Sequence, residues 1–172
     1  KIKHYLSTEQ LTTAIIAYVI SKLDQNNCLL YGIPATLLKK LQRIQNAAAR
    51  MICKARKYDE ALPLLSKLHW LRIAHYIDFK VMLLTYKALH GEAPLYILNL
   101  LVPYNPDRSL RSSDQSYLVE PRVISKYGER AFAACAPRLW NNLPLQIRDS
   151  NTTCAFKSSL PLLFRKAFSR YL

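Results

Sequence analysis

Glycine is scarce in this chain, occurring at only three of 172 positions. Loops that cradle phosphates through backbone amides need several closely spaced glycines, as in the G-x-G-x-x-G and G-x-x-x-x-G-K-[ST] motifs. The strained turn that presents a nucleophilic serine, G-x-S-x-G, needs two. Neither kind of loop is present in the sequence. The common nucleotide-binding loops and the serine-hydrolase elbow are therefore excluded.

Clusters of metal-ligating residues are also missing. The four cysteines have no C-x-x-C spacing and the four histidines fit no zinc-finger pattern, which favours buried free thiols in a reducing compartment. The segment Tyr76-Ile77-Asp78-Phe79 has the form Y-x-D, but a two-metal site needs an adjacent second carboxylate, and Phe79 stands in that place. We therefore expect no catalytic residue, no metal and no cofactor in this chain.

Long apolar runs are absent too. No stretch of about 18 apolar residues is free of charge, so we expect no membrane span. Residues 1–13 are polar and no small-residue cleavage site follows them, so we expect no signal peptide. With 51% apolar and 21% charged residues, the chain has the composition of a folded domain. These features predict an intracellular protein, nuclear or cytoplasmic.

Acidic residues are few, 11 against 25 lysines and arginines, which gives a net charge of +14. The excess is distributed along the chain: residues 1–101 carry 14 basic and 6 acidic side chains, and residues 102–172 carry 11 and 5. The folded surface itself must therefore hold the charge. Such a surface attracts polyanions, of which nucleic acid is the commonest. A basic protein without a polyanionic partner is the alternative.

Apolar periodicity predicts a mainly α fold. Ser7 to Gln10 has the form of a capping box at the start of a helix that the polar run 24–27 ends. Further helical segments are predicted at 36–56, 59–68, 73–91, 94–101, 130–136, 137–142 and 153–168, with breaks at Pro137 and Pro161. A strand at 117–123, paired with 109–112, predicts one short β-hairpin. We expect a helical, thumb-like half at 1–101 and a smaller mixed half at 102–172, packed together.

The segment 36–56 separates apolar from basic residues. At about 100° per residue, one face collects the apolar side chains of Leu37, Leu41, Ile44, Ala48, Met51, Ile52 and Ala55. The opposite face collects Lys39, Lys40, Arg43, Arg50, Lys54 and Lys57. No acidic residue occurs between Asp24 and Asp59, so none of these cations has an acidic residue four positions away along the chain. A stripe of one sign suits phosphates, although a solvated helix face is the simpler alternative.

A second basic group follows in the mixed half. It contains Arg108, Arg111, Arg122, Arg130, Arg138 and Arg148, and the tyrosines Tyr104, Tyr117 and Tyr127 lie among them. Guanidinium groups on phosphates and aromatic rings under bases suit single-stranded RNA, although the rings can equally belong to the core. Trp70 and Trp140 are expected in the core. The predicted nucleic-acid-binding residues are Lys39, Lys40, Arg43, Arg50, Lys54, Lys57, Arg108, Arg111, Arg122, Arg130 and Arg138.

Eight motifs in a fixed order carry a family resemblance. They are SKLDQNNCLLYGIP (21–34), LLKKLQRIQNAAARMI (37–52), LHWLRI (68–73), IDFKVMLLTYKALHG (77–91), NPDRSLRSS (105–113), VEPR (119–122), YGERAFAACAPRLWNNLP (127–144) and FKSSL (156–160). In this order they resemble the C-terminal, post-palm region of the reverse transcriptases of LINE-type, jockey-like non-LTR retrotransposons. Each motif alone is weak, and the ordered set covers nearly the whole chain.

The resemblance implies a non-catalytic segment of an RNA-directed DNA polymerase that holds template RNA or an RNA–DNA hybrid. The catalytic palm and the endonuclease domain of such an element would lie upstream and would be the partners of this segment. An alternative from a different class is a freed retroelement fragment whose Leu-rich helices bind another protein. A helix-turn-helix regulator is a third alternative, but no pair of helices with the required short turn is evident.

Overall fold

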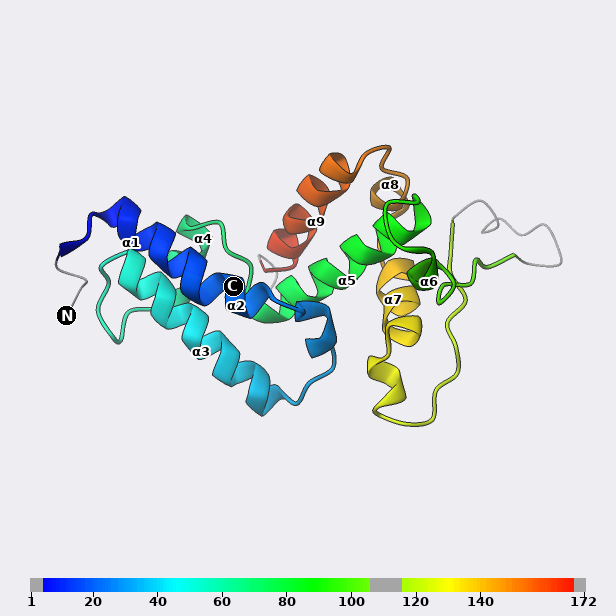
Figure 1. Cartoon of the computed structure of the whole chain (residues 1–172), viewed down its shortest axis with the longest axis horizontal. Coiled ribbons are helices and arrows are strands. Elements are labelled where there is room, and N and C mark those ends of the chain that lie inside the picture. The colour runs from blue at the N-terminus through cyan, green and yellow to red at the C-terminus, as the bar shows by residue number, and fades with distance from the viewer. Residues whose placement is uncertain (1–4, 106–115, 169–172) are drawn as a thin grey trace. The chain divides into compact units, whose positions relative to one another are not determined.

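A computed structural model of the chain describes residues 5–105 and 116–168 (Figure 1). This described part is mainly helical, as the sequence predicts, and none of its helices is long and apolar enough to cross a bilayer. The chain divides into two compact units, unit 1 (Lys1–Tyr76) and unit 2 (Ile77–Leu172). The division falls inside the helix α5 (Ile73–Leu89), whereas the sequence led us to expect a boundary near residue 101. The apolar periodicity of a helix continues across a unit boundary that falls inside it, so the sequence pattern does not reveal the boundary.

Unit 1 begins with the predicted capping box. The Ser7 Oγ accepts a hydrogen bond from the Gln10 amide at 3.2 Å, and the Gln10 Oε1 accepts one from the Ser7 amide at 2.9 Å. Three helical segments follow directly on one another: α1 (Thr8–Ile15), a π-helical turn (Ile16–Ile20) and α2 (Ser21–Asp24). They end before Asn26, whose φ of 54° lies in the left-handed region. Both the start and the break are where the sequence predicts them.

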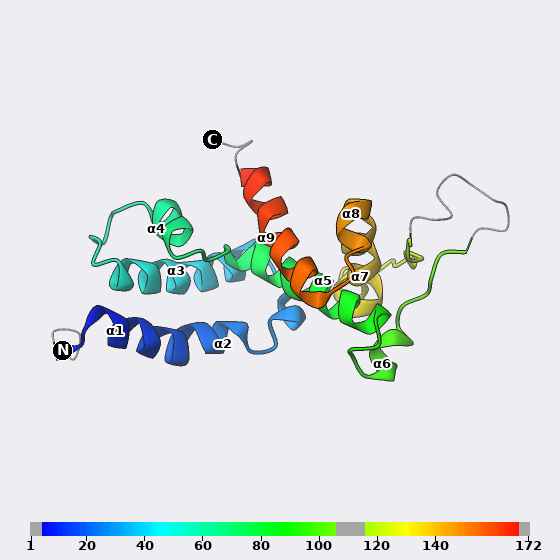
Figure 2. The ribbon, with the colours of Figure 1, turned by 90° about the horizontal axis from the view of Figure 1, so that it is seen from above.

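The helix α3 (Ala35–Ile52) packs beside α1, as Figures 1 and 2 both show. Its buried side chains are Gln45, Ala48, Ala49 and Ile52. Spacings of three, four and seven residues bring these side chains to one face of the helix. The resulting core of unit 1 contains Leu11, Ile15, Ala48 and Ile52, with Leu6, Val19, Ile20, Leu68 and Trp70 packed against it.

The predicted apolar face of this helix is wrong in part. Leu37, Ile44 and Met51 are 46%, 47% and 41% exposed, although they were expected in the core. The buried face is instead rotated toward Gln45 and Ala49, where small side chains and a hydrogen-bonded amide contact the rest of unit 1. A periodicity analysis judges each residue by its own hydropathy. It therefore underestimates the burial of small residues and of polar residues whose side chains find a hydrogen-bond partner.

The helices that follow agree with the predicted segments. They are α4 (Ala61–Lys67), α5 (Ile73–Leu89) and α6 (Leu95–Leu98). Gly91 ends α5 with a φ of 72°, and the Glu92 amide donates to the Lys87 carbonyl at 2.8 Å. A left-handed glycine with such a backward bond is a common helix terminator, because glycine adopts this conformation without strain. The glycine cap expected at this position is confirmed.

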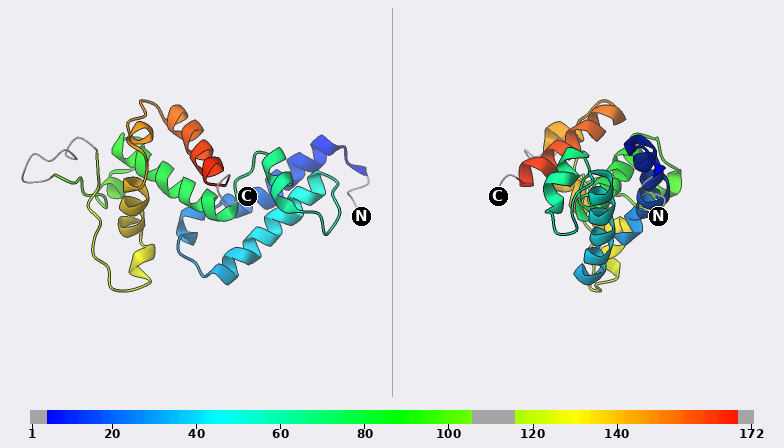
Figure 3. Two further views of the ribbon diagram at one scale, coloured as in Figure 1. Left: turned by 180° about the vertical axis from the view of Figure 1, so that it is seen from behind. Right: turned by 90° about the vertical axis from the view of Figure 1, so that its left-hand side faces the viewer.

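An aromatic cluster forms the core of unit 2. It joins α5 to α7 (Phe132–Asn141) and to α9 (Thr153–Phe168), which lies alongside α5 in Figures 1 and 3. The rings of Tyr86 and Phe156 stack with centroids 4.3 Å apart, and Trp140 lies 6.0 Å from Phe156. The Tyr86 hydroxyl donates a hydrogen bond to the Ser150 carbonyl at 2.6 Å. Ser150 lies two residues after the end of α8 (Leu145–Arg148). Trp140 is therefore a core residue, as expected, while Trp70 is half-buried.

Two prolines lie inside helices without ending them. α7 continues through Pro137, and α9 continues through Pro161, so both predicted breaks are wrong. A proline within a helix removes one backbone hydrogen bond and crowds the preceding turn. Pro137 is fully buried beside the aromatic core, so the apolar area that its ring removes from water offsets this cost.

The predicted strand at 117–123 does not form. The described residues of this segment contain a single antiparallel bridge, between Pro103 and Leu118. Two hydrogen bonds flank this bridge: the Tyr104 amide donates to the Tyr117 carbonyl at 2.9 Å, and the Val119 amide donates to the Val102 carbonyl at 2.8 Å. The expected partner of the strand, residues 109–112, lies outside the described part of the chain.

Candidate nucleic-acid interface

Three basic side chains lie together on α3. Lys39, Lys40 and Arg43 are exposed and fall within about one helical turn. At about 100° per residue they point away from the face that carries Gln45 and Ala49. We call these three residues the α3 stripe. Because no acidic residue occurs between Asp24 and Asp59, the charge of the α3 stripe is not neutralised along its own helix.

The other cations predicted for this helix are not part of the α3 stripe. Arg50 is half-buried, and its Nε donates a hydrogen bond to the Asp59 carbonyl at 3.0 Å. The helix ends at Ile52, so Lys54 and Lys57 lie beyond it, Lys54 with a left-handed φ of 53°. The Lys57 Nζ lies 5.6 Å from the centre of the Tyr58 ring. The stripe of exposed cations is therefore shorter than the six residues predicted, because Arg50 is half-buried and bonded to the Asp59 carbonyl and because the helix ends one turn early.

The second basic group is only partly described. Arg122 is exposed in an extended segment, and Arg138 is exposed on α7. Arg130 is half-buried, with its guanidinium 5.4 Å from the centre of the Tyr127 ring. Arg108 and Arg111 lie outside the described residues. The expected combination of arginine and tyrosine therefore occurs at Arg130 with Tyr127, which are close in sequence, and at Arg148 with Tyr117, which are not.

One arginine outside the predicted set has an unusual environment. Arg148, the last residue of α8, is 4% exposed, and its guanidinium lies 4.2 Å from the centre of the Tyr117 ring. The Nε and Nη1 atoms are buried without a hydrogen-bond partner in the described part of the chain. Nothing in the sequence separates Arg148 from its exposed basic neighbours, because its burial depends on residues more than 30 positions away.

Among the residues that the structure describes, an acidic group with a strongly altered pKa lies on α5. Burial raises the pKa of the Asp78 carboxyl to about 6, and His75, one turn earlier, has its pKa lowered by burial and by the nearby Arg72. Both shifts favour the neutral form of the side chain. Among the residues that the structure describes, no three His, Cys, Asp or Glu side chains are grouped as metal ligands.

Comparisons of the chain with protein families, with curated proteins and with solved structures give no match. The resemblance to retrotransposon reverse transcriptases therefore rests on the ordered sequence motifs.

Proposed function

We propose that this chain binds nucleic acid without catalysing a reaction on it, as the C-terminal segment of a non-LTR retrotransposon RNA-directed DNA polymerase. The ligand in this proposal is template RNA or an RNA–DNA hybrid. The upstream palm and endonuclease domains of the element would carry the chemistry. The ordered motifs support the family, and the net charge of +14 supports a polyanionic ligand.

The α3 stripe is the observation that carries the proposal. Lys39, Lys40 and Arg43 are exposed on one side of a helix whose other side is packed in the core of unit 1. A rigid helix holds their charges at fixed spacing, so binding a chain of phosphates does not require the backbone to be ordered first. Contacts of this kind supply affinity and position, and they carry little sequence preference.

The salt dependence of RNA binding tests this function. The affinity for a single-stranded RNA can be measured by fluorescence anisotropy. The logarithm of the association constant should fall linearly with the logarithm of the salt concentration, with a slope of ~0.7 per phosphate contact. Replacing Lys39, Lys40 and Arg43 by glutamine should therefore flatten the slope by about two units. Unrelated RNA sequences should lose similar affinity, because phosphate contacts carry no base information. An RNA–DNA hybrid and a DNA duplex measured beside them establish the preferred ligand.

A control variant that removes the same number of charges elsewhere distinguishes a binding site on α3 from general attraction to a basic surface. Lys22, Lys67 and Lys157 are exposed and lie outside the α3 stripe, on α2, α4 and α9. Their replacement by glutamine removes the same three charges and should change the slope far less. Equal losses in both triple variants would contradict an interface on α3, and a parent chain that does not bind RNA would contradict the proposed function itself.

A protein-interaction module is the second candidate function. Leu37, Ile44 and Met51 are exposed and seven residues apart, so they form an apolar row along α3 beside the α3 stripe. A photoreactive benzoylphenylalanine at position 44 distinguishes the two functions in cells. Cross-linked products that ribonuclease digests support nucleic-acid binding, and products that only protease digests support a protein partner.

A further inference from the structure

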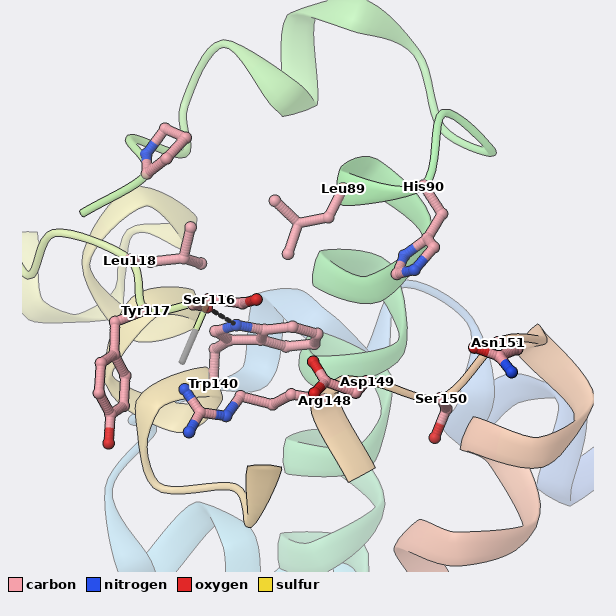
Figure 4. A pocket seen from close by; sticks show the side chains of 11 residues that line it. Leu89, His90, Ser116, Tyr117, Leu118, Trp140, Arg148, Asp149, Ser150 and Asn151 are labelled. Carbon is pink, nitrogen blue, oxygen red and sulfur yellow. Dashed lines mark hydrogen bonds between the residues drawn. The ribbon is translucent and has the colours of Figure 1, made fainter. Parts of the chain in front are cut away.

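A pocket of about 580 Å³ opens within unit 2 (Figure 4). Its walls come from the end of α5, from the bridged segments at Pro103 and Leu118, from Trp140 of α7, and from Arg148 and the residues after it. The volume lies within the range of roughly 300–1,000 Å³ that is typical of ligand sites. Every residue that lines this pocket belongs to unit 2, whereas the α3 stripe belongs to unit 1.

The guanidinium of Arg148 is the only enclosed charge in the wall of this pocket as the structure describes it. Figure 4 shows its side chain extending past Trp140 toward the ring of Tyr117. The side chain is 4% exposed, and its Nε and Nη1 have no hydrogen-bond partner among the described residues. Removing a guanidinium from water is costly unless its N–H groups find acceptors. A bound anion would supply those acceptors.

Two other polar groups of the wall donate hydrogen bonds within the fold. The Trp140 Nε1 donates to the Ser116 carbonyl at 2.9 Å, and the Ser150 Oγ donates to the Ile147 carbonyl at 2.7 Å. The guanidinium also lies over the Tyr117 ring, 4.2 Å from the ring centre, where a cation is attracted to the aromatic face. Among the described residues of this wall, the buried side-chain donors without a partner are those of Arg148.

We infer that this pocket binds a singly charged phosphodiester group of a single-stranded polynucleotide, held by the guanidinium of Arg148. This inference rests on the proposed function and adds to it a site in unit 2. A guanidinium presents paired N–H groups that match two oxygens of one phosphate. The apolar wall formed by Leu89, Pro103 and Leu118 accommodates the sugar or base attached to that phosphate.

The charge balance of the pocket selects among anions. The Asp149 carboxylate also lines the pocket, so one cation and one anion are already present there. A terminal phosphate, which carries close to two negative charges, is repelled by Asp149 more strongly than a phosphodiester, which carries one. The net charge of +14 favours polyanionic chains over isolated carboxylates as the source of the group.

The test follows the indole N–H of Trp140 by NMR during titration of the full chain. The probe is a dinucleoside monophosphate, which has one phosphodiester and no terminal phosphate. Its neutral methylphosphonate analogue, inorganic phosphate and acetate are titrated in parallel. Trp70, the other of the two tryptophans, lies in unit 1 and serves as the internal control. A Trp70→Phe variant assigns the two indole signals.

A saturable shift of the Trp140 signal with the dinucleotide, and none with the methylphosphonate, is the expected result. Inorganic phosphate and acetate should act only at much higher concentration. A Trp140 signal that does not move with the dinucleotide overturns the inference. A response to acetate alone overturns it as well, because the pocket would then select a carboxylate. The titrations themselves use the parent chain, and the Trp70→Phe variant serves only to assign the two indole signals.

Variants of Arg148 separate a binding role from a structural one. Arg148→Met should weaken binding of the dinucleotide roughly tenfold or more, as expected for loss of a charge-assisted hydrogen bond. Its thermal midpoint should equal or exceed that of the parent, because an unpaired buried charge is removed. A large fall of the midpoint would assign Arg148 to the fold and overturn the inference. Arg148→Lys keeps the charge but loses the fork, so it should also bind more weakly.

The two proposals fail in distinguishable ways. If replacement of the α3 stripe weakens RNA binding while Arg148→Met leaves RNA and dinucleotide binding unchanged, the pocket is not a phosphodiester site and the proposed function stands. If the parent chain binds no RNA at any salt concentration, the proposed function is wrong. The inference then fails with it, even where the dinucleotide moves the Trp140 signal, because the polynucleotide source of the phosphodiester would be lost.

Discussion

The side-chain Oε1 of Gln42 accepts a hydrogen bond from the backbone amide of Ile73 at 3.0 Å. Ile73 is the first residue of α5, where backbone amides have no partner inside the helix. Beside it, the Nε2 of Gln45 donates to the Leu71 carbonyl at 2.8 Å, and the Nε2 of Gln42 donates to the Gln45 Oε1, also at 2.8 Å. Two glutamines of α3 thereby satisfy the backbone at the start of α5.

The Gln45→Leu substitution should therefore destabilise the chain by about 1–3 kcal/mol, the range expected when a buried carbonyl loses its donor. Leucine is apolar and of similar size, so the change tests the hydrogen bonds more than the packing. Urea denaturation followed by circular dichroism measures the effect. Gln25→Leu, at an exposed position of unit 1, is the matched control and should leave the midpoint unchanged. Equal midpoints for both variants would contradict a stabilising role of the glutamine pair.

An aspartate on α3 should distinguish its buried face from its exposed one. Ile52→Asp places an unpaired charge in the core of unit 1 and should unfold that unit, with a loss above roughly 3 kcal/mol. Ile44→Asp, at a side chain 47% exposed, should keep the helicity of the parent. Circular dichroism and thermal melting give the comparison. If Ile44→Asp unfolds the chain and Ile52→Asp does not, the face predicted from periodicity is the buried one.

Asp78 should make the chain less stable as pH rises. Its folded-state pKa of about 6 lies above its ordinary value of 3.8, so the protonated form favours folding. The carboxyl is protonated in both states below both values and opposes folding progressively as pH rises through about 6. Asp78→Asn should therefore gain about 1–2 kcal/mol at pH 7.5, a value reduced because the side chain remains partly hydrated. At pH 3 the variant and the parent should be equally stable.

The control for this pH dependence is Glu129→Gln, a neutralisation at an exposed position of unit 2. It should leave the pH profile of the parent unchanged. Urea midpoints from pH 3 to pH 8 provide the measurement. A constant difference between Asp78→Asn and the parent across this range would mean that burial of the carboxyl does not oppose folding.

The four cysteines should differ in reactivity, since none of them forms a disulfide and their exposure differs. Cys154 is exposed, Cys28 and Cys53 are half-buried, and Cys135 is buried. Brief treatment of the native chain with iodoacetamide should modify Cys154 first, and Cys135 should require denaturant, because alkylation needs access to the thiolate. Mass spectrometry of the peptides measures both. Labelling of Cys135 as fast as that of Cys154 would show that unit 2 opens readily.

The sequence by itself determined the local features of this protein. The capping box at Ser7 and the glycine that ends α5 at Gly91 depend on residues a few positions apart. They can therefore be predicted from the sequence without knowledge of the fold. The mainly α class follows from periodicity in the same way. The excess of positive charge, and the absence of acidic residues between Asp24 and Asp59, are properties of the sequence that folding does not change.

Only the tertiary structure decided which side chains of these helices are buried and which are exposed. The buried face of α3 is set by its contacts with α1 and by the partners of Gln45, and α7 runs through Pro137 because its ring is enclosed. Arg148 lies over Tyr117, 31 positions earlier in the chain. Burial and hydrogen bonding of this kind depend on segments distant in sequence, and neither hydropathy nor spacing along one helix contains that information.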